Sequence, residues 1–442
     1  MKFNLDNVRF WVIRNMAPVV FLAAYFFTVV LGNLVYLTPF GHAYLQKTSS
    51  YLAIYNFSTL FSFGYWILLF LPFLVTPLIV MLVRFKMEHR VNNFVNLIPD
   101  FSKVDFSVIV FCCFFIVIYS LLKADAITLF SSGFDATSSV EARFKILNQT
   151  GFFALVVLMS LLSYFSLYSL VKWFCSKQFF WTIATGLMLV LMTICLVLLN
   201  MKWPILIFYL ALVLAVFIYS QRRPYLKASV GGVFLVIVYL LISVFVFRIS
   251  SNADHQTSSI TNAPEFAIEN APMLMMAAIN RMAISYPYYY HIFTTEGHVC
   301  GGVFEQAKRG PTCRPSTFIY SRIYDDGFKG RGTSPAAVHV SGYALGSWSI
   351  AILALICASV ILGLFTCIPL NASAAVGALR ITGAIVGYHF SQLPGEGPLI
   401  YDHGVLWLFF ALLLYKGYLW ICATLTPIKS VSNNLLPNHK RK

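Results

Sequence analysis

The sequence predicts an all-α, polytopic membrane protein, and two features of the chain lead to that class. Hydrophobic residues make up 59% of the 442 positions and charged residues only 11%, whereas soluble domains carry about 25% charged residues. Apolar runs of about 20 residues recur along the chain, which is the length that an α-helix needs to cross a bilayer. We therefore expect about ten transmembrane helices, with one large loop domain outside the membrane between helices 7 and 8.

The apolar runs give the expected helices in order. The first run is too long for the apolar part of a signal peptide and no cleavage site follows it, so we expect an uncleaved helix. A hairpin turn joins the fifth and sixth helices, and Pro204 suits the first turn of the sixth. The expected spans are 11–36, 60–83, 106–122, 152–171, 180–199, 203–219, 230–247, 347–368, 374–390 and 404–423.

Basic residues are distributed unevenly along the chain. They collect in the N-terminal segment, in short segments at 84–90, 172–177 and 221–227, and in the tail at 440–442, whereas the long loop at 250–346 has seven acids and seven Lys or Arg. This asymmetry follows the positive-inside rule and places both termini in the cytoplasm. The net charge of +15 is therefore a topology signal, and no nucleic-acid partner is expected.

The chain divides into three parts: helices 1–7 at 1–249, the loop domain at 250–346, and helices 8–10 with the tail at 347–442. The loop domain holds seven of the sixteen carboxylates and four of the nine histidines. Reactive side chains are thus concentrated in this domain.

The first part of the loop domain predicts a helix at 263–285, with Pro264 and Glu265 in its first turn. An apolar stripe suggests that this helix packs on its own domain or lies on the lipid surface. The following tyrosines at 286–290 are expected as belt residues at the membrane interface. The alternative is that they stack on sugar rings, with Tyr289 as a substrate contact.

Two cysteines, Cys300 and Cys313, lie outside the spans and bracket a short loop. In an oxidising compartment they are expected to form a disulfide, which would stabilise the loop by about 3 kcal/mol in the chain-entropy model. Two free thiols are the alternative.

The rest of the loop domain, 308–346, is rich in arginine, glycine and proline and is expected to be irregular. A guanidinium matches phosphate oxygens in a bidentate manner, so this composition suits the recognition of phosphate or pyrophosphate. Solvated structural arginines are the alternative.

Absent features narrow the reaction class. None of the sixteen acids lies in the middle of a span, which disfavours a proton-coupled or ion-coupled transporter. No Walker A motif, HExxH motif or nucleophile elbow is found. Asp325 and Asp326 are a weak metal candidate without a partner motif, so neither a metal nor another cofactor is expected.

The order of about ten spans, a large late loop and a few closing spans resembles the oligosaccharide repeat-unit polymerases of bacterial O-antigen and capsule pathways (Wzy type). It is also similar to the related O-antigen ligases. An Arg-x10-Gly spacing occurs in periplasmic loops of some members, and Arg331 to Gly342 matches it.

The resemblance implies a multi-pass protein of the bacterial inner membrane whose long loop is periplasmic. Its donor would be a glycan on undecaprenyl pyrophosphate and its acceptor a repeat unit on the same carrier, with a chain-length regulator protein as a further partner. Fixed cations would stabilise the pyrophosphate leaving group without a metal. The candidates for this role are Arg281, Arg314, Arg322, Arg331 and Lys202.

The acceptor hydroxyl also needs a general base. His339 is the first candidate and Glu296 the second. Two other functions stay open: an O-antigen ligase with lipid A-core as the acceptor, and a flippase or transporter of lipid-linked sugars that forms no bond.

Overall fold

The computed structural model describes residues 5–128, 145–199, 202–241, 276, 279–280, 283–308, 313–324, 332–369, 373–393 and 405–425. In this part of the chain the regular secondary structure is helical, apart from an isolated bridge between Ala336 and Leu393. The predicted all-α class is confirmed.

Six of the described helical segments are long and apolar enough to cross a membrane: Met16–Val35, Phe57–Val95, Lys103–Lys123, Phe152–Ser176, Phe179–Leu198 and Val338–Thr366. Two further apolar helices are shorter: Pro204–Tyr219 and Leu406–Cys422. The chain is therefore a multi-pass membrane protein.

Helices occur in all ten regions where the sequence predicts spans. The first region comprises α1 (Leu5–Arg14), α2 (Met16–Tyr25), the π-helical segment η1 (Phe26–Val30) and α3 (Leu31–Val35). The fourth comprises α11 (Phe152–Val156), the π-helical segment η2 (Val157–Leu162) and α12 (Ser163–Ser176). The others are α7 (Phe63–Val95), α8 (Lys103–Lys123), α13 (Phe179–Leu198), α14 (Lys202–Tyr219), α15 (Pro224–Leu241), α21 (Val338–Thr366), α22 (Ala374–Ser391) and α24 (Val405–Leu425).

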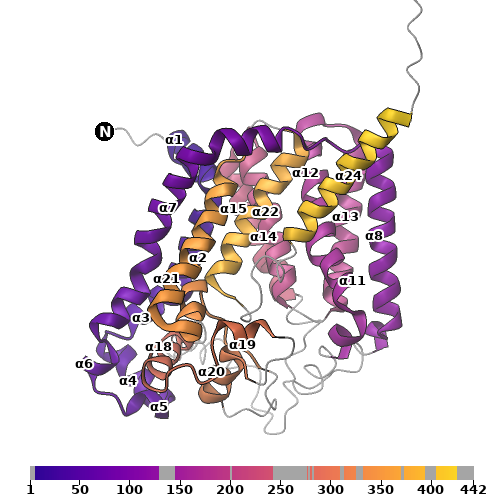
Figure 1. Ribbon diagram of the computed structural model, residues 1–442. Coiled ribbons are helices and arrows are strands. Elements are labelled where there is room, and N and C mark those ends of the chain that lie inside the picture. The colour runs from indigo at the N-terminus through magenta and orange to yellow at the C-terminus, as the bar shows by residue number, and fades with distance from the viewer. Residues whose placement is uncertain are drawn as a thin grey trace, which may run out of the picture.

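Helix α22 lies at the centre of the bundle, where it packs against α2 on one side and α12 and α14 on the other (Figure 1). Its small residues allow this close approach. A Cβ atom added at Gly387 would lie 2.3 Å from the Ala17 carbonyl oxygen, and one added at Gly383 would lie 2.4 Å from the Phe365 ring. The Gly/Ala-rich composition of α22 is thus a packing requirement.

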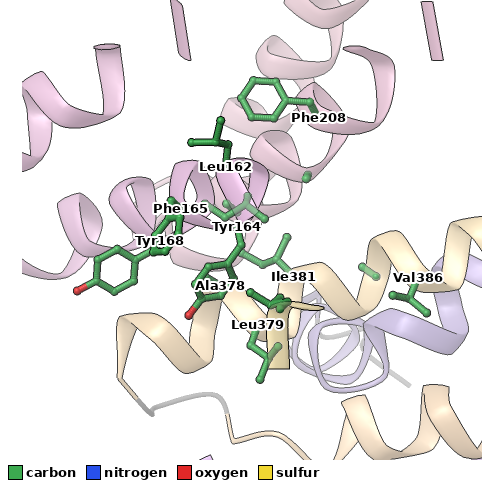
Figure 2. Packing of buried hydrophobic residues seen from close by; sticks show 14 of the residues in the cluster. Leu162, Tyr164, Phe165, Tyr168, Phe208, Ala378, Leu379, Ile381 and Val386 are labelled. Carbon is green, nitrogen blue, oxygen red and sulfur yellow. The ribbon is translucent and has the colours of Figure 1, made fainter. Parts of the chain in front are cut away.

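Aromatic and aliphatic side chains fill the space between α22 and α12 (Figure 2). Tyr164 is buried there and donates a hydrogen bond of 2.9 Å to the Ala375 carbonyl at the start of α22. Because the Tyr164 hydroxyl donates to a backbone carbonyl, it is buried in this core with its hydrogen bond satisfied.

The basic segment at 84–90, predicted as a loop, is instead part of α7. It contains neither glycine nor proline, and Glu88 pairs with Arg14 at 2.9 Å and with Arg84, one turn earlier, at 3.3 Å. These contacts favour continuation of the helix beyond the apolar stretch.

Among the described residues, six short helices lie at one end of the bundle, and we call them the cap: α4 (Pro39–Thr48), α5 (Ser50–Ala53), α6 (Phe57–Leu60), α18 (Ser285–Thr295), α19 (Val303–Ala307) and α20 (Pro315–Ile323). The cap lies opposite the end that holds α1 and the C-terminal end of α24 (Figure 1). The expectation that 308–346 is irregular is wrong for α20, where Pro315 stands in the first turn and fixes a helical φ.

Helix α21 contains a kink at Gly346 and Ser347, where Ser347 has a φ of 52°. The turns before the kink, Val338–Leu345, pack on the cap. The long apolar stretch after the kink begins at 347, where the sequence predicts the start of a span. The predicted helix at 263–285 lies mostly outside the described residues.

Candidate functional site

Helix α18, with the sequence SYPYYYHIFTT, is buried from Ser285 to Phe293. The expectation that its tyrosines form a belt at the membrane surface is therefore wrong. Each polar tip reaches a partner on another segment, so burial does not leave it unsatisfied. The contacts are Tyr286 to the Tyr65 carbonyl (2.7 Å), Tyr288 to Ser49 (2.7 Å), Tyr289 to the Ser334 carbonyl (3.3 Å), Tyr290 to Ser62 (3.0 Å) and His291 to the Leu60 carbonyl (2.9 Å).

Ring contacts connect α18 to residues 51–55 of the cap and, through Tyr65 and Tyr286, to α7. The Tyr55 and His291 rings are stacked, with centroids 4.6 Å apart, and Tyr51 stacks on Tyr288 at 5.3 Å. Hydrogen bonds and ring contacts together fix α18 against segments more than 200 positions earlier in the chain. Helix α18 is thus the buried helix of the cap, and we call it the aromatic floor.

His291 is the histidine of the aromatic floor. Its Nε2 lies 2.9 Å from the Leu60 carbonyl oxygen, which identifies Nε2 as the protonated, donating nitrogen. Burial lowers the pKa of His291 below its ordinary value, and the hydrogen bond to Leu60 opposes that change only in part. The imidazole is therefore neutral near pH 7.

His339, the second residue of α21, has no exposed surface. Its Nε2 is 3.3 Å from the hydroxyl of Tyr25, which lies 3.0 Å from the Leu69 carbonyl and donates to it. The Leu68 backbone also lies close to the imidazole. Pro72 lacks an amide hydrogen, so the Leu68 carbonyl of α7 is left without its usual helical partner.

A second polar group is buried nearby in the first span. Asn33 is fully buried, donates to the Val29 carbonyl at 2.8 Å and accepts a hydrogen bond from the Tyr65 hydroxyl. Tyr36 donates to the side chain of Asn280 at 2.6 Å. Our reading of the sequence missed these residues, although an Asn inside an apolar run is a signal that a polar partner lies opposite.

Charged side chains lie at the exposed surface of the cap, in a group that we call the rim: Glu296, Arg314 and Arg322. Glu296 follows the last turn of α18, and Arg322 lies in the last turn of α20. The nearest side-chain nitrogen and oxygen of Arg322 and Glu296 are 3.8 Å apart, and the Arg322 guanidinium lies 5.1 Å from the Phe318 ring centroid. Because the pair is loose and exposed, both groups remain available to a ligand.

A disulfide bond joins Cys300 and Cys313, with Cα atoms 5.0 Å apart. The Gln306 amide donates to the backbone carbonyls of both cysteines at 2.8 Å. The bridge and the glutamine therefore connect Cys300, shortly after α18, to Cys313, shortly before α20.

The structure brings only some of the sequence candidates together. Glu296 and Arg322 are paired at the rim, and Arg314 stands exposed directly before α20. His339 and Tyr289 are fully buried, so neither contributes to the surface of the rim. Arg281, Arg331, Asp325 and Asp326 lie outside the described residues, and only the backbone of Lys202 is described.

Within the described ranges, no group of three or more His, Cys, Asp or Glu side chains is arranged to hold a metal ion. The cationic groups that the rim offers to an anion are guanidinium groups.

Comparison with known proteins returns no match: no protein-family model, no curated protein and no solved structure is significantly similar to the chain.

Proposed function

We propose that this protein is a glycosyltransferase of a bacterial inner membrane that joins lipid-linked oligosaccharide repeat units at the periplasmic face. The donor is a glycan on undecaprenyl pyrophosphate, and the acceptor is one repeat unit on the same carrier. The cap is the periplasmic end, and the ten helical regions are ten membrane spans.

The distribution of charge supports this orientation. The end opposite the cap holds α1 (Figure 1), which carries Arg9 and Arg14, and Glu88 of α7 pairs with both Arg14 and Arg84. The first cap segment, 38–59, contains no acid and one lysine. Cytoplasmic segments are enriched in Lys and Arg, so the cap faces the other side.

The observation that carries the proposal is the position of Glu296 and Arg322. Both are exposed where the end of the aromatic floor meets α20, and one offers a carboxylate and the other a guanidinium fork. Transfer from a lipid pyrophosphate needs these two groups: a proton acceptor for the incoming hydroxyl and a cation for the leaving group.

In the proposed reaction, the acceptor hydroxyl attacks the anomeric carbon of the donor sugar. The bond from that carbon to the pyrophosphate oxygen breaks, the new glycosidic bond forms, and the hydroxyl proton passes to Glu296. Arg322 and Arg314 stabilise the negative charge on the pyrophosphate, and Arg281 and Arg331 are the further candidates from the sequence. No metal step is needed, because guanidinium groups supply the positive charge.

Glu296 is the better candidate for the base because it is exposed, whereas His339 is enclosed. His339 is then a positioning residue that holds the start of α21 against α2 through Tyr25. The aromatic floor keeps the distance between α18 and α20 fixed while the substrates exchange.

The test is the surface glycan of cells that lack this gene. A single repeat unit on lipid A-core supports polymerisation, since units are still transported and ligated. Complete absence of repeat units on lipid A-core would contradict the proposal and indicate a ligase or a flippase.

A further inference from the structure

A groove runs between α8 and α13, two helices at one side of the bundle (Figure 1). It encloses about 590 Å³, within the range of small-molecule sites. Large side chains that line it, including Phe111, Phe115 and Leu187, are more than half exposed. In a membrane they face hydrocarbon.

The lining is almost entirely apolar and runs along both helices from Phe106 to Leu122 and from Phe180 to Leu191. Ser107 is one of its few polar residues, and its hydroxyl is already bonded to the Lys103 carbonyl at 2.8 Å. An apolar space of this kind excludes water, so a hydrocarbon chain is the occupant that suits it.

A lysine stands at one end of the groove. Lys103 is the first residue of α8, and it lies one turn before Ser107 on the same helical face. Its Nζ is 5.7 Å from the centroid of Phe180, a ring that lines the groove. Lys103 is exposed and lies three residues after Asp100, which pairs with Lys172 of α12.

The charge of Lys103 is not neutralised locally. Among the described residues no carboxylate lies within 4.0 Å of its ammonium group. Asp105, two residues away, accepts hydrogen bonds from Ser102 and from Tyr415 of α24 instead. A free cation therefore stands where an apolar groove meets the membrane surface.

We propose that this groove binds one anionic phospholipid. One acyl chain lies between α8 and α13, and the phosphate lies at Lys103. The lipid comes from the leaflet at the Lys103 end and fills the space that separates the two helices.

The test counts lipids on the full-length protein by native mass spectrometry after reconstitution in nanodiscs of equal amounts of phosphatidylglycerol and phosphatidylethanolamine. Wild-type protein is expected to retain one phosphatidylglycerol. Ala184→Trp places a bulky ring in the groove and should retain none. The matched control is Val190→Trp, on an exposed position of α13 outside the groove, which should retain the lipid.

The headgroup is tested by Lys103→Ala, which should lower the preference for phosphatidylglycerol by about fivefold. Lys103→Arg should retain the preference. Lys123→Ala, at the other end of α8, should leave it unchanged.

Three results would overturn the proposal. The first is equal retention of phosphatidylglycerol by Ala184→Trp and wild type. The second is an unchanged preference in Lys103→Ala. The third is a wild-type dimer that Ala184→Trp converts to a monomer, which would assign the groove to a second copy of the chain.

Discussion

The hydroxyl of Tyr25 lies 3.3 Å from Nε2 of His339, although the two residues are 314 positions apart in the chain. This contact joins the first membrane helix to the beginning of α21. Both side chains are fully buried, so the contact lies in a region where water cannot replace a lost partner.

Tyr25→Phe should therefore destabilise the protein. The change leaves His339 Nε2 without its partner, at a cost of about 1–3 kcal/mol for a buried polar group. We expect a lower midpoint of thermal unfolding in detergent, measured by intrinsic fluorescence. The control is Tyr119→Phe on α8, where the residue is 60% exposed; equal midpoints for the two variants would show that the Tyr25 contact contributes nothing.

His291 should make the stability of the cap depend on pH. Its folded-state pKa lies below the ordinary value of 6.5, so below that pH the unfolded chain binds a proton that the folded chain does not. The resulting loss of stability begins as the pH falls through 6.5 and is complete below the folded-state pKa.

Unfolding midpoints measured from pH 8 to pH 5 should therefore decline in the acidic range. His291→Gln can still donate to the Leu60 carbonyl but does not titrate in this range. This variant should show a shallower decline than wild type. An identical decline in both proteins would exclude His291 as a source of the pH dependence.

The disulfide of the cap should be detectable and should stabilise the segment that it closes. Replacement of both Cys300 and Cys313 by serine should lower the free energy of unfolding by about 3 kcal/mol. Cys112→Ser, which removes an exposed free cysteine in α8, is the control and should have little effect. A membrane-impermeant maleimide should label neither Cys300 nor Cys313 without reductant, and labelling of native protein would contradict the pairing.

The fold class could be predicted from the sequence because a membrane helix satisfies its own backbone hydrogen bonds, and so length and hydropathy suffice to find it. The extension of α7 through Arg84 could not be found in this way. The apolar stretch of the sequence ends where the apolar core of the membrane ends. The helix continues into the polar region, because the residues that follow are compatible with helical backbone.

The candidate site was harder to predict, since its partners are distant in the sequence. The tyrosines of α18 look like interfacial residues when they are considered alone. Their burial depends on hydrogen-bond partners such as Ser49 and the Tyr65 carbonyl, more than 220 positions earlier. The sequence identifies arginine and carboxylate candidates by residue type. It does not show that Glu296 pairs with Arg322, because that pairing depends on the packing of α18 against α20.

Reporter fusions test the orientation of the molecule. A fusion at Lys308, exposed in the cap, should report the periplasm, and a fusion at Arg223, between α14 and α15, should report the cytoplasm. The same location for both fusions would contradict the proposed topology.

The most direct test of the central claim is polymer formation by the purified protein in nanodiscs supplied with undecaprenyl-pyrophosphate-linked repeat units. Wild-type protein should produce a ladder of longer lipid-linked glycans. Glu296→Gln should slow that reaction by about 100-fold or more, which is the usual contribution of a general base. Arg322→Ala should slow it by about 10- to 100-fold through loss of a charge-assisted contact. Glu305→Gln, an exposed carboxylate of α19 paired with Lys308, should behave like wild type. A full ladder at the wild-type rate from Glu296→Gln, or no ladder from the wild-type protein, would contradict the account.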